Sequence, residues 1–306
     1  MASERKWNEI DPLEVINGRL DSAMGRLSSC DLCPRRCGVD RTSGEIGACK
    51  IGREAIVASY GPHHGEEKPL VGRNGSGTIF FSGCNLACQY CQNWDISQKV
   101  RGEKVNPEGL GEIMLSLQAR GCHNINLVSP SHVVAQILEG LNEAFKEGLK
   151  IPIVYNTGGY DSLDTLKLLD GIVDIYMPDM KYSDPSVGKR LSLVEDYPSV
   201  NREAVKEMYR QVGDLKMDRR GVAMKGLLVR HLVLPGGLAG SAEVARFLTR
   251  EISSETYVNV MAQYRPEYRA DQYEGVERRP TPGEYVRAVR GFVDAGIHRL
   301  DERYLL

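Results

Sequence analysis

The 306-residue sequence has no apolar run near the roughly 20 residues that a membrane-spanning helix needs. Its first residues, MASERKWNEIDPLEV, lack the apolar core of a secretory signal. We therefore expect a cytoplasmic protein with no membrane partner. An excess of charge is lacking too, because 39 Lys and Arg stand against 41 Asp and Glu. This balance argues against a broad attraction for nucleic acid.

The informative residues are the eight cysteines. A chain of this length buries a core without cross-links, and a reducing compartment disfavours disulfides. Seven of the eight fall into two groups, Cys30, Cys33, Cys37 and Cys49, then Cys84, Cys88 and Cys91. Clustered thiols in such a chain indicate metal sites. Cys122 stands alone, and we expect it to be a small buried hydrophobe.

From residue 78 onward, apolar β-branched runs alternate with helical patterns. The runs are typical of buried parallel strands and cover 78–83, 125–129, 151–157, 172–177, 227–234 and 257–263. The last helix begins cleanly, with Thr281 as N-cap, Pro282 at N1 and Glu284 at N3. Six strand–helix units predict an α/β fold, a parallel (β/α)6 partial TIM barrel. Functional side chains then lie at the C-terminal ends of the strands.

A smaller N-terminal part precedes this barrel. Apolar residues at intervals of three and four predict an amphipathic helix over 12–27, and a strand is expected over 55–60. The first cysteine group lies between them in a segment rich in turns. We expect residues 1–60 to form a helix plus a four-cysteine metal-binding extension, and residues 61–306 to form the barrel.

The segment FFSGCNLACQYCQNWDIS places three cysteines just beyond the first barrel strand. Three thiolates within eight residues can bind one iron–sulfur cube and leave its fourth iron without a protein ligand. Gly83 and Ala87 let the loop wrap tightly, and Tyr90 offers an aromatic face to the cluster or to a bound base. A zinc knuckle without its fourth ligand, or three incidental buried thiols, is the competing interpretation.

The motif Cys-x3-Cys-x-aromatic-Cys at the end of a first barrel strand resembles the radical S-adenosylmethionine (SAM) superfamily. The continuation from Cys91 to Asp95 resembles the branch of pyruvate formate-lyase activating enzyme, and its PflX-like relatives most of all. The resemblance covers nearly the whole chain from Cys30. It implies a radical SAM oxidoreductase with a [4Fe-4S] cluster held by Cys84, Cys88 and Cys91.

In that superfamily SAM chelates the open iron, and one electron cleaves it to methionine and a 5′-deoxyadenosyl radical that abstracts hydrogen. The resemblance implies a flavodoxin- or ferredoxin-type electron donor and a protein substrate, as for a glycyl-radical activase. A small metabolite or another protein side chain is the alternative substrate. The Leu-Pro-x-His segment that activases usually carry on the sixth strand is missing here. A zinc-binding interaction module is the alternative from a different class.

The later strand ends can be compared with the same family. The second ends in Ser129-Pro130-Ser131-His132 where the family has a Gly-Gly-Glu-like motif, and its serines either contact SAM or cap the next helix. Asn156-Thr157-Gly158-Gly159 resembles the turn that gathers a monovalent cation and the SAM carboxylate. The residues that the resemblance assigns to SAM are Tyr90, Asn93, Ser129, Ser131, Asn156, Thr157, Asp179, Lys181 and Arg230.

Charged residues close the fourth strand and interrupt the fifth. Asp179 and Lys181 match the family's Asp-x-Lys, so that Asp179 binds the cation or orients Lys181 toward the SAM carboxylate. A surface ion pair is the plainer interpretation. Alternation along the fifth strand sends Arg230 and His231 to opposite faces, so at most one points into the barrel. A buried Arg230 paired with a nearby carboxylate is the alternative to a SAM contact.

Two further groups stay open. Cys30, Cys33, Cys37 and Cys49 can close a zinc or mononuclear iron site, hold an auxiliary cluster, or remain free thiols, and we favour the closed mononuclear site. The loop before the first barrel strand carries His63, His64, Glu66 and Glu67, which face a substrate at one end of the barrel or are solvated surface. Gln263 and Tyr264, after the sixth strand, are further candidates to contact substrate.

Overall fold

The computed structural model describes residues 11–301. Its strands are β1 (Ala55–His63), β2 (Ser76–Phe81), β3 (Glu103–Val105), β4 (Ile125–Val128), β5 (Ile153–Thr157), β6 (Ile175–Pro178), β7 (Lys216–Met217), β8 (Ala223–Leu232) and β9 (Tyr257–Met261). They form one sheet in the order β3-β1-β2-β4-β5-β6-β8-β7, with β9 paired to β8. The pairings from β2 through β4, β5, β6 and β8 to β9 are all parallel. This confirms the predicted (β/α)6 partial barrel.

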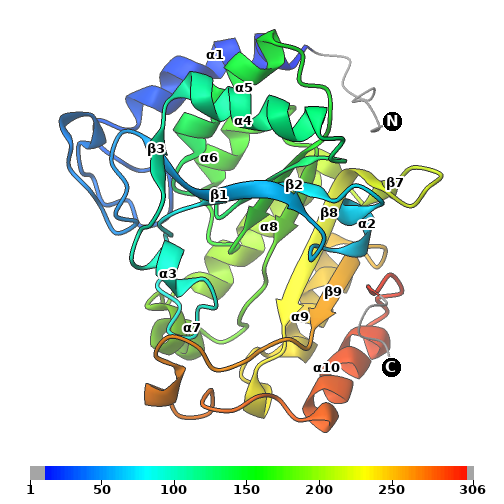
Figure 1. Ribbon diagram of the computed structural model, residues 1–306. Helices are drawn as coiled ribbons and strands as arrows, with labels where there is room; N and C mark the ends of the chain where they lie inside the picture. The colour runs from blue at the N-terminus through cyan, green and yellow to red at the C-terminus, as the bar shows by residue number, and fades with distance from the viewer. Residues whose placement is uncertain (1–10, 302–306) are drawn as a thin grey trace.

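Helices accompany the strands within residues 11–301, and the longer ones cover the outer face of the sheet (Figure 1). The helices are α1 (Pro12–Gly25), α2 (Lys68–Val71), α3 (Trp94–Ser97), α4 (Pro107–Ala119), α5 (Val134–Lys146), α6 (Leu163–Leu168), α7 (Pro185–Ser192), α8 (Tyr197–Val212), α9 (Ser241–Phe247) and α10 (Pro282–Asp294). The capping box predicted for the last helix is present, since Thr281 and Glu284 each accept the other's backbone N–H. The predicted N-terminal helix is α1, and Ile16 and Ala23 on it are fully buried in the main core.

Side chains alternate between the barrel lumen and the helices, as the pleat of a strand requires. Leu70 from α2 packs in one cluster with Val154, Ile175, Leu228 and other lumen residues. Their strand neighbours, such as Tyr155 and Val229, belong to the core beneath the helices. Because Leu70 reaches the lumen cluster, α2 closes the N-terminal end of the barrel.

The largest departure from the predicted fold lies in β1. The strand expected over 55–60 continues to His63, and it pairs antiparallel with both β2 and β3. Its last residue pairs with Ser76, the first residue of β2. The sheet therefore runs across the boundary expected at residue 60. Positions 1–10 and 302–306 of the two expected parts lie outside the described residues.

Both edges of the sheet are covered by a further short segment, which is β3 beside β1 and residues 299–301 beside β9. β3 has only three residues, of which Glu103 and Lys104 are exposed. On the other side, residues 299–301 run along β9, where the Val258 N–H donates to the Arg299 carbonyl at 2.9 Å and the Asp301 N–H to the Val258 carbonyl at 2.9 Å. Short charged margins and covering segments are usual features of sheet edges.

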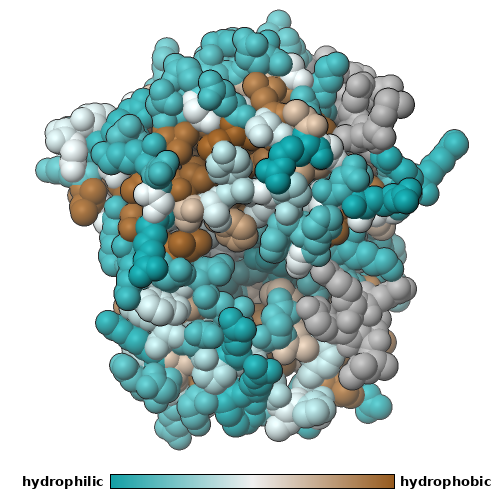
Figure 2. Space-filling model, viewed as in Figure 1, coloured by the Kyte–Doolittle hydropathy of each residue, from teal (hydrophilic) through white to brown (hydrophobic). Residues whose placement is uncertain are grey.

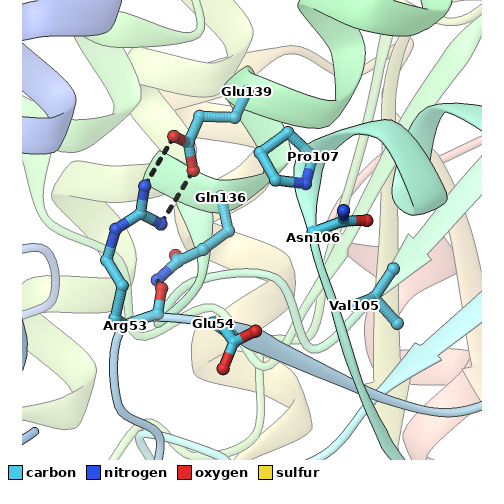
Figure 3. Close-up of a pocket in the computed structure, with 7 residues that line it drawn as sticks. All are labelled: Arg53, Glu54, Val105, Asn106, Pro107, Gln136 and Glu139. Atoms are coloured by element: carbon cyan, nitrogen blue, oxygen red, sulfur yellow. Dashed lines mark hydrogen bonds and ion pairs between the residues drawn. The ribbon is translucent and has the colours of Figure 1, made fainter.

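A pocket of about 230 Å³ lies on the outer side of the sheet, between β3, α4 and α5 (Figure 3). Arg53 points at Glu139 there and forms two bonds with its carboxylate, of 2.9 and 2.7 Å. The Gln136 amide donates to the Arg53 carbonyl at 2.7 Å. These contacts fix the chain that leads from the N-terminal cysteines into β1. Within residues 11–301, no helix combines the length and the apolar character that crossing a bilayer requires.

Candidate active site

Cys84, Cys88 and Cys91 lie on the loop that leaves the C-terminal end of β2. Gly83 starts this loop with φ +78°, and a Cβ there would lie 2.5 Å from the carbonyl oxygen of Cys49, so the turn requires glycine. Burial raises the pKa of Cys84 to about 12, and the charges of Cys88 and Cys91 act in the same direction. The three thiols are therefore close enough for a charge on one to change the pKa of another.

Each sulfur has a polar neighbour: the Leu86 N–H lies 3.4 Å from Cys84 Sγ, the Ser192 hydroxyl 3.0 Å from Cys88 Sγ and the Ser97 hydroxyl 3.3 Å from Cys91 Sγ. The Ser192 hydroxyl is 2.8 Å from that of Tyr182, which is 2.6 Å from that of Tyr90. Hydrogen bonds to ligand sulfurs tune an iron–sulfur centre. Ser192 and Tyr182 were missed from the sequence, since they stand about a hundred positions beyond the cysteines in unremarkable segments.

Tyr90 is buried beside the cysteines. Its ring packs edge-to-face on Tyr182 at 6.4 Å and on Tyr264 at 5.6 Å between centroids. Tyr264 donates its hydroxyl to the Val276 carbonyl at 2.6 Å and is itself buried, so it supports Tyr90 and presents little surface to a substrate. Two other predicted residues are exposed: Asn93, the N-cap of α3, and Gln263, the second residue after β9.

Asp179, just beyond β6, accepts from two cations. Its Oδ1 lies 2.8 Å from Arg230 Nε and its Oδ2 lies 2.5 Å from Lys181 Nζ. Burial would raise the pKa of Asp179, but the charges of Arg230 and Lys181 hold it below its ordinary value. Burial acts to lower the pKa of Lys181, and the charges of Asp179 and Cys88 outweigh it and raise that pKa. Both carboxylate oxygens are thus engaged, which favours the orienting role of Asp179 over a cation-binding role.

Arg230 and His231 take opposite faces of β8, as predicted. Arg230 shares the lumen face with Leu228 and meets Asp179 there. His231 points to the helices, with Nδ1 2.8 Å from the Met180 carbonyl and Nε2 2.8 Å from the Ser241 hydroxyl. Burial lowers the pKa of His231 to about 4, so the ring is neutral at physiological pH. The two hydrogen bonds therefore fix a neutral imidazole between β8 and α9.

The serines and threonine predicted near SAM form a separate hydrogen-bonded group. The hydroxyls of Ser131 and Thr157 lie 2.9 Å apart, and Thr157 donates to Asp161 at 2.7 Å. The interpretation of the serines as caps of the next helix is wrong, because the N-cap of α5 is Val133 and has no side-chain cap bond. Ser129 directly follows β4 and has φ +58°, a strained conformation for a residue with a side chain.

The turn after β5 packs directly on the end of β6. Gly159 has φ +76°, and a Cβ on it would clash with the carbonyl oxygen of Asp179. Asn156, two positions beyond the lumen residue Val154, shares its face of β5 and is buried. The predicted turn therefore brings Asn156 and Asp179 to the same end of the barrel.

The His-Glu loop lies at the N-terminal end of the barrel, away from the cysteine loop, because β1 runs antiparallel to β2. His63 and His64 are exposed, whereas Glu66 and Glu67 are 7% and 3% exposed. His63 Nδ1 lies 2.8 Å from Glu66 Oε1. Burial would raise the pKa of Glu66, but the bond from His63 and the charge of Arg230 hold it below its ordinary value. The loop thus sends its carboxylates inward and leaves its imidazoles outside.

Several acceptors beside these carboxylates are buried and unmatched. The Asn259 amide donates to Glu67 Oε1 at 3.0 Å. Within residues 11–301, Glu67 Oε2, Asn259 Oδ1 and Asn126 Oδ1 have no hydrogen-bond partner. Burial raises the pKa of Glu67, although the charge of Arg230 opposes it. Figure 2 shows a hollow at the centre of this face of the molecule, below the β1–β2 pair. Buried acceptors without a partner in the protein call for a donor from a ligand or an ordered water.

The N-terminal cysteines gather outside the barrel. Cys30, Cys33 and Cys49 are buried, and Cys37 is exposed. Across residues 11–301, no three His, Cys, Asp or Glu side chains are already arranged around the position of a single metal ion. Cys122 is fully buried in the main core, as predicted.

The model of the Radical SAM superfamily matches residues 78–236, just over half of the chain. The chain therefore belongs to the radical SAM superfamily. It is 33% identical over 285 residues to an uncharacterized protein of Methanocaldococcus jannaschii, covering 90% of this chain and 77% of that protein.

Three solved structures are also similar to this chain. A radical SAM methyltransferase from Sphaerobacter thermophilus has a TM-score of 0.46 at 14% identity, over 72% of this chain and 64% of that one. HydG, a maturase of the [FeFe]-hydrogenase, gives 0.49 at 11%, over 70% and 48%. TYW1 with a lysine-pyruvate adduct bound gives 0.43 at 10%, over 71% and 73%. The chain spans less than two thirds of the length of the first two structures.

Membership of this family makes the protein an enzyme and implies a [4Fe-4S] cluster, SAM and a reductant. It favours the enzyme over the zinc-binding interaction module. The residues present fit these cofactors. Three mutually close thiols on one loop suit a cube with one iron left open, and the paired cations Lys181 and Arg230 suit a carboxylate.

Proposed function

We propose that this protein is a radical SAM enzyme of the pyruvate formate-lyase activating enzyme-like, PflX-like type, in which Cys84, Cys88 and Cys91 hold the [4Fe-4S] cluster. The observation that carries the proposal is the meeting of these thiols at the C-terminal end of β2, on a loop that Gly83 allows to turn tightly. Lys181 lies close enough for its charge to act on Cys88, which joins the cysteine loop to the strand ends.

Held by Cys84, Cys88 and Cys91 and reduced, the cluster would supply one electron to SAM, giving methionine and a 5′-deoxyadenosyl radical able to take hydrogen from a substrate. The chain's own residues prepare that site. Lys181 and Arg230 retain donors beyond those given to Asp179, and these are free to bind the SAM carboxylate. Asp179 holds both cations in place, and Asn156 faces the same lumen. The buried Tyr90 would wall the cluster side of the site.

For the substrate, the motif from Cys91 to Asp95 supports a protein whose glycine loses a hydrogen. A small metabolite that carries an amine or another N–H donor is a second candidate. It is supported by the unmatched acceptors of Glu67, Asn126 and Asn259, all nine-tenths or more buried. Each oxygen left without a donor in a dry site costs stability, so a substrate that supplies donors would bind there.

Three further parts of the proposal follow from the class. A flavodoxin- or ferredoxin-type protein would deliver the electron, and the exposed residues Gln92 and Asn93 beside Cys91 offer it an approach. The cytoplasm is the proposed location, where such donors are reduced. A monovalent cation has less support, because Asp179 already accepts from two side chains.

The test compares the wild-type chain with C84A/C88A/C91A and with the matched control C122A, all reconstituted anaerobically with iron and sulfide. With dithionite and SAM, wild type and C122A are expected to form 5′-deoxyadenosine, and the triple variant none above the background. Equal product from the triple variant would contradict the assignment of the ligands. Mass spectrometry of 5′-deoxyadenosine then separates the substrates, since deuterium arrives from a glycine-labelled protein in one case and from a labelled amine in the other.

A further inference from the structure

The four N-terminal cysteines are brought together by tight backbone turns. The Cys30 N–H donates to the Val39 carbonyl at 2.9 Å, and the Gly38 N–H to the Cys30 carbonyl at 3.0 Å. This pairing returns the chain so that Cys37 Sγ lies 3.9 Å from the Cys30 carbonyl. The thiols are close enough for the charges of Cys30, Cys37 and Cys49 each to act on Cys33.

Backbone amides point at two of these sulfurs. Burial raises the pKa of the Cys33 thiol to about 12 and also raises that of Cys49, and the hydrogen bonds from the Arg35 and Ile51 N–H groups act in the opposite direction. The Leu86 N–H has the same relation to Cys84 in the proposed cluster loop, again two positions after its cysteine. Amide dipoles directed at a sulfur stabilise the thiolate, which is the form that binds metal.

Arg41 is the decisive neighbour of this group. It is 1% exposed, and it donates to the Gly52 carbonyl at 2.9 Å and to the His132 carbonyl at 2.7 Å. Its Nη1 also lies 3.7 Å from Cys30 Sγ, and its charge acts on Cys49. Its Nη2 is buried and has no hydrogen-bond partner within the described residues.

A buried guanidinium needs an anion, because the cost of removing a charge from water is recovered only by a charged partner. The partners that Arg41 contacts are two neutral carbonyls and a cysteine sulfur. Thiolates would supply the missing negative charge, and several thiolates coexist in a small volume only when a metal cation holds them together.

We propose that Cys30, Cys33, Cys37 and Cys49 bind a second metal centre as thiolates, with Arg41 as its buried counter-ion. The centre is separate from the cluster of the active site and does not depend on SAM chemistry. Zinc, iron and an iron–sulfur cluster share this thiolate chemistry, and the experiment below distinguishes them.

The contacts of this segment also indicate a structural role for the centre, which is to stabilise the loop that carries the active-site cysteines. Arg35 Nε donates to the Asn85 carbonyl at 2.8 Å, inside that loop. The Cys49 carbonyl lies against Gly83. Arg41 reaches the His132 carbonyl, and His132 Nε2 lies 2.9 Å from the Ser82 carbonyl, just before the loop begins. Closing the four thiols around a metal would thus fix the chain on which Cys84 depends.

The test uses the full chain with C84A/C88A/C91A, so that failure of the proposed function leaves it unaffected. Metal and acid-labile sulfide are counted after anaerobic purification from cells supplied with zinc and iron. We expect about one zinc, one iron, or two to four irons with matching sulfide per chain, and any of these supports the proposal. Less than about 0.1 metal per chain would overturn it.

X-ray absorption at the edge of the metal found provides a second measurement that needs no change in the four cysteines. Scattering dominated by sulfur supports the assignment, and scattering dominated by nitrogen and oxygen refutes it. R41Q should lower the affinity for the metal by about 10- to 100-fold, as removal of outer-shell partners typically does. R210Q, which changes an exposed arginine that pairs with Asp170 and Glu207 and not with a thiol, is the matched control and should leave affinity unchanged. Equal affinity in wild type, R41Q and R210Q would remove the counter-ion from the proposal.

Discussion

Replacing Asp179 with Asn isolates the ion-pair group that we propose holds SAM. Asn keeps the size of the side chain but removes its charge, and it leaves Arg230 and Lys181 facing a neutral group. The side chains of Asp179, Lys181 and Arg230 are 14%, 14% and 19% exposed. They are thus mostly shielded from water, which would otherwise screen the repulsion between the two cations.

Removing one partner from a buried ion pair costs about 3 to 5 kcal/mol. Because water still reaches part of each side chain here, the lower end applies, and we expect D179N to lose about 3 kcal/mol of unfolding free energy. That loss lowers the ratio of folded to unfolded chain by about two powers of ten. SAM binding should weaken as well, because Lys181 loses the group that orients it.

Urea unfolding followed by circular dichroism measures this loss, with wild type and variants compared at equal metal content. D164N is the control, since Asp164 and its partner Lys167 are 55% and 62% exposed. An exposed pair contributes less than about 1 kcal/mol. If D179N and D164N unfold within about 0.5 kcal/mol of each other, the reasoning from burial is refuted.

Two other predictions concern stability. Burial lowers the pKa of His231 and that of His132 from 6.5 to about 4. Between these values the unfolded chain binds a proton that the folded chain does not, so stability falls as the pH drops from 6.5 to 4, by about 3 kcal/mol for each histidine. Urea unfolding at several pH values gives the unfolding free energy as a function of pH. Between pH 6.5 and 4 this free energy should fall less steeply in H231Q than in wild type, and an equally steep fall would contradict the assignment to His231. G159A should lose about 2 kcal/mol more unfolding free energy than G148A. Both glycines have positive φ, but only at Gly159 would the added methyl group clash with the Asp179 carbonyl. Equal losses of unfolding free energy in urea would contradict this reasoning.

The sequence was sufficient for features set by local pattern. Apolar β-branched runs marked the six parallel strands, because a strand buried on both faces must be apolar throughout. The alternation of a pleated strand alone places Arg230 and His231 on opposite faces of β8. Tight spacing of cysteines identified the thiol groups, since neighbours in sequence cannot lie far apart.

The remaining features depend on which distant segments meet. Nothing near Cys88 in the sequence indicates that the Ser192 hydroxyl contacts its sulfur. Nothing near Thr157 indicates that its hydroxyl donates a hydrogen bond to Asp161. The direction of β1 was not predicted, because a strand pattern carries no sign for parallel or antiparallel pairing. That direction decides that Glu66 and Glu67 approach the lumen from the N-terminal end. The counter-ion role of Arg41 became visible only when burial left its Nη2 without a partner.

The covered margins of the sheet have a consequence for how copies of the protein behave together. A barrel that stops short of closure leaves strand backbones able to recruit a strand from another molecule, which is a route to aggregation. Here β1 and the short, charged β3 cover one side, and residues 299–301 hydrogen-bond along β9 on the other. The strand edges that a partial barrel would offer to another molecule are therefore covered, or are short and charged.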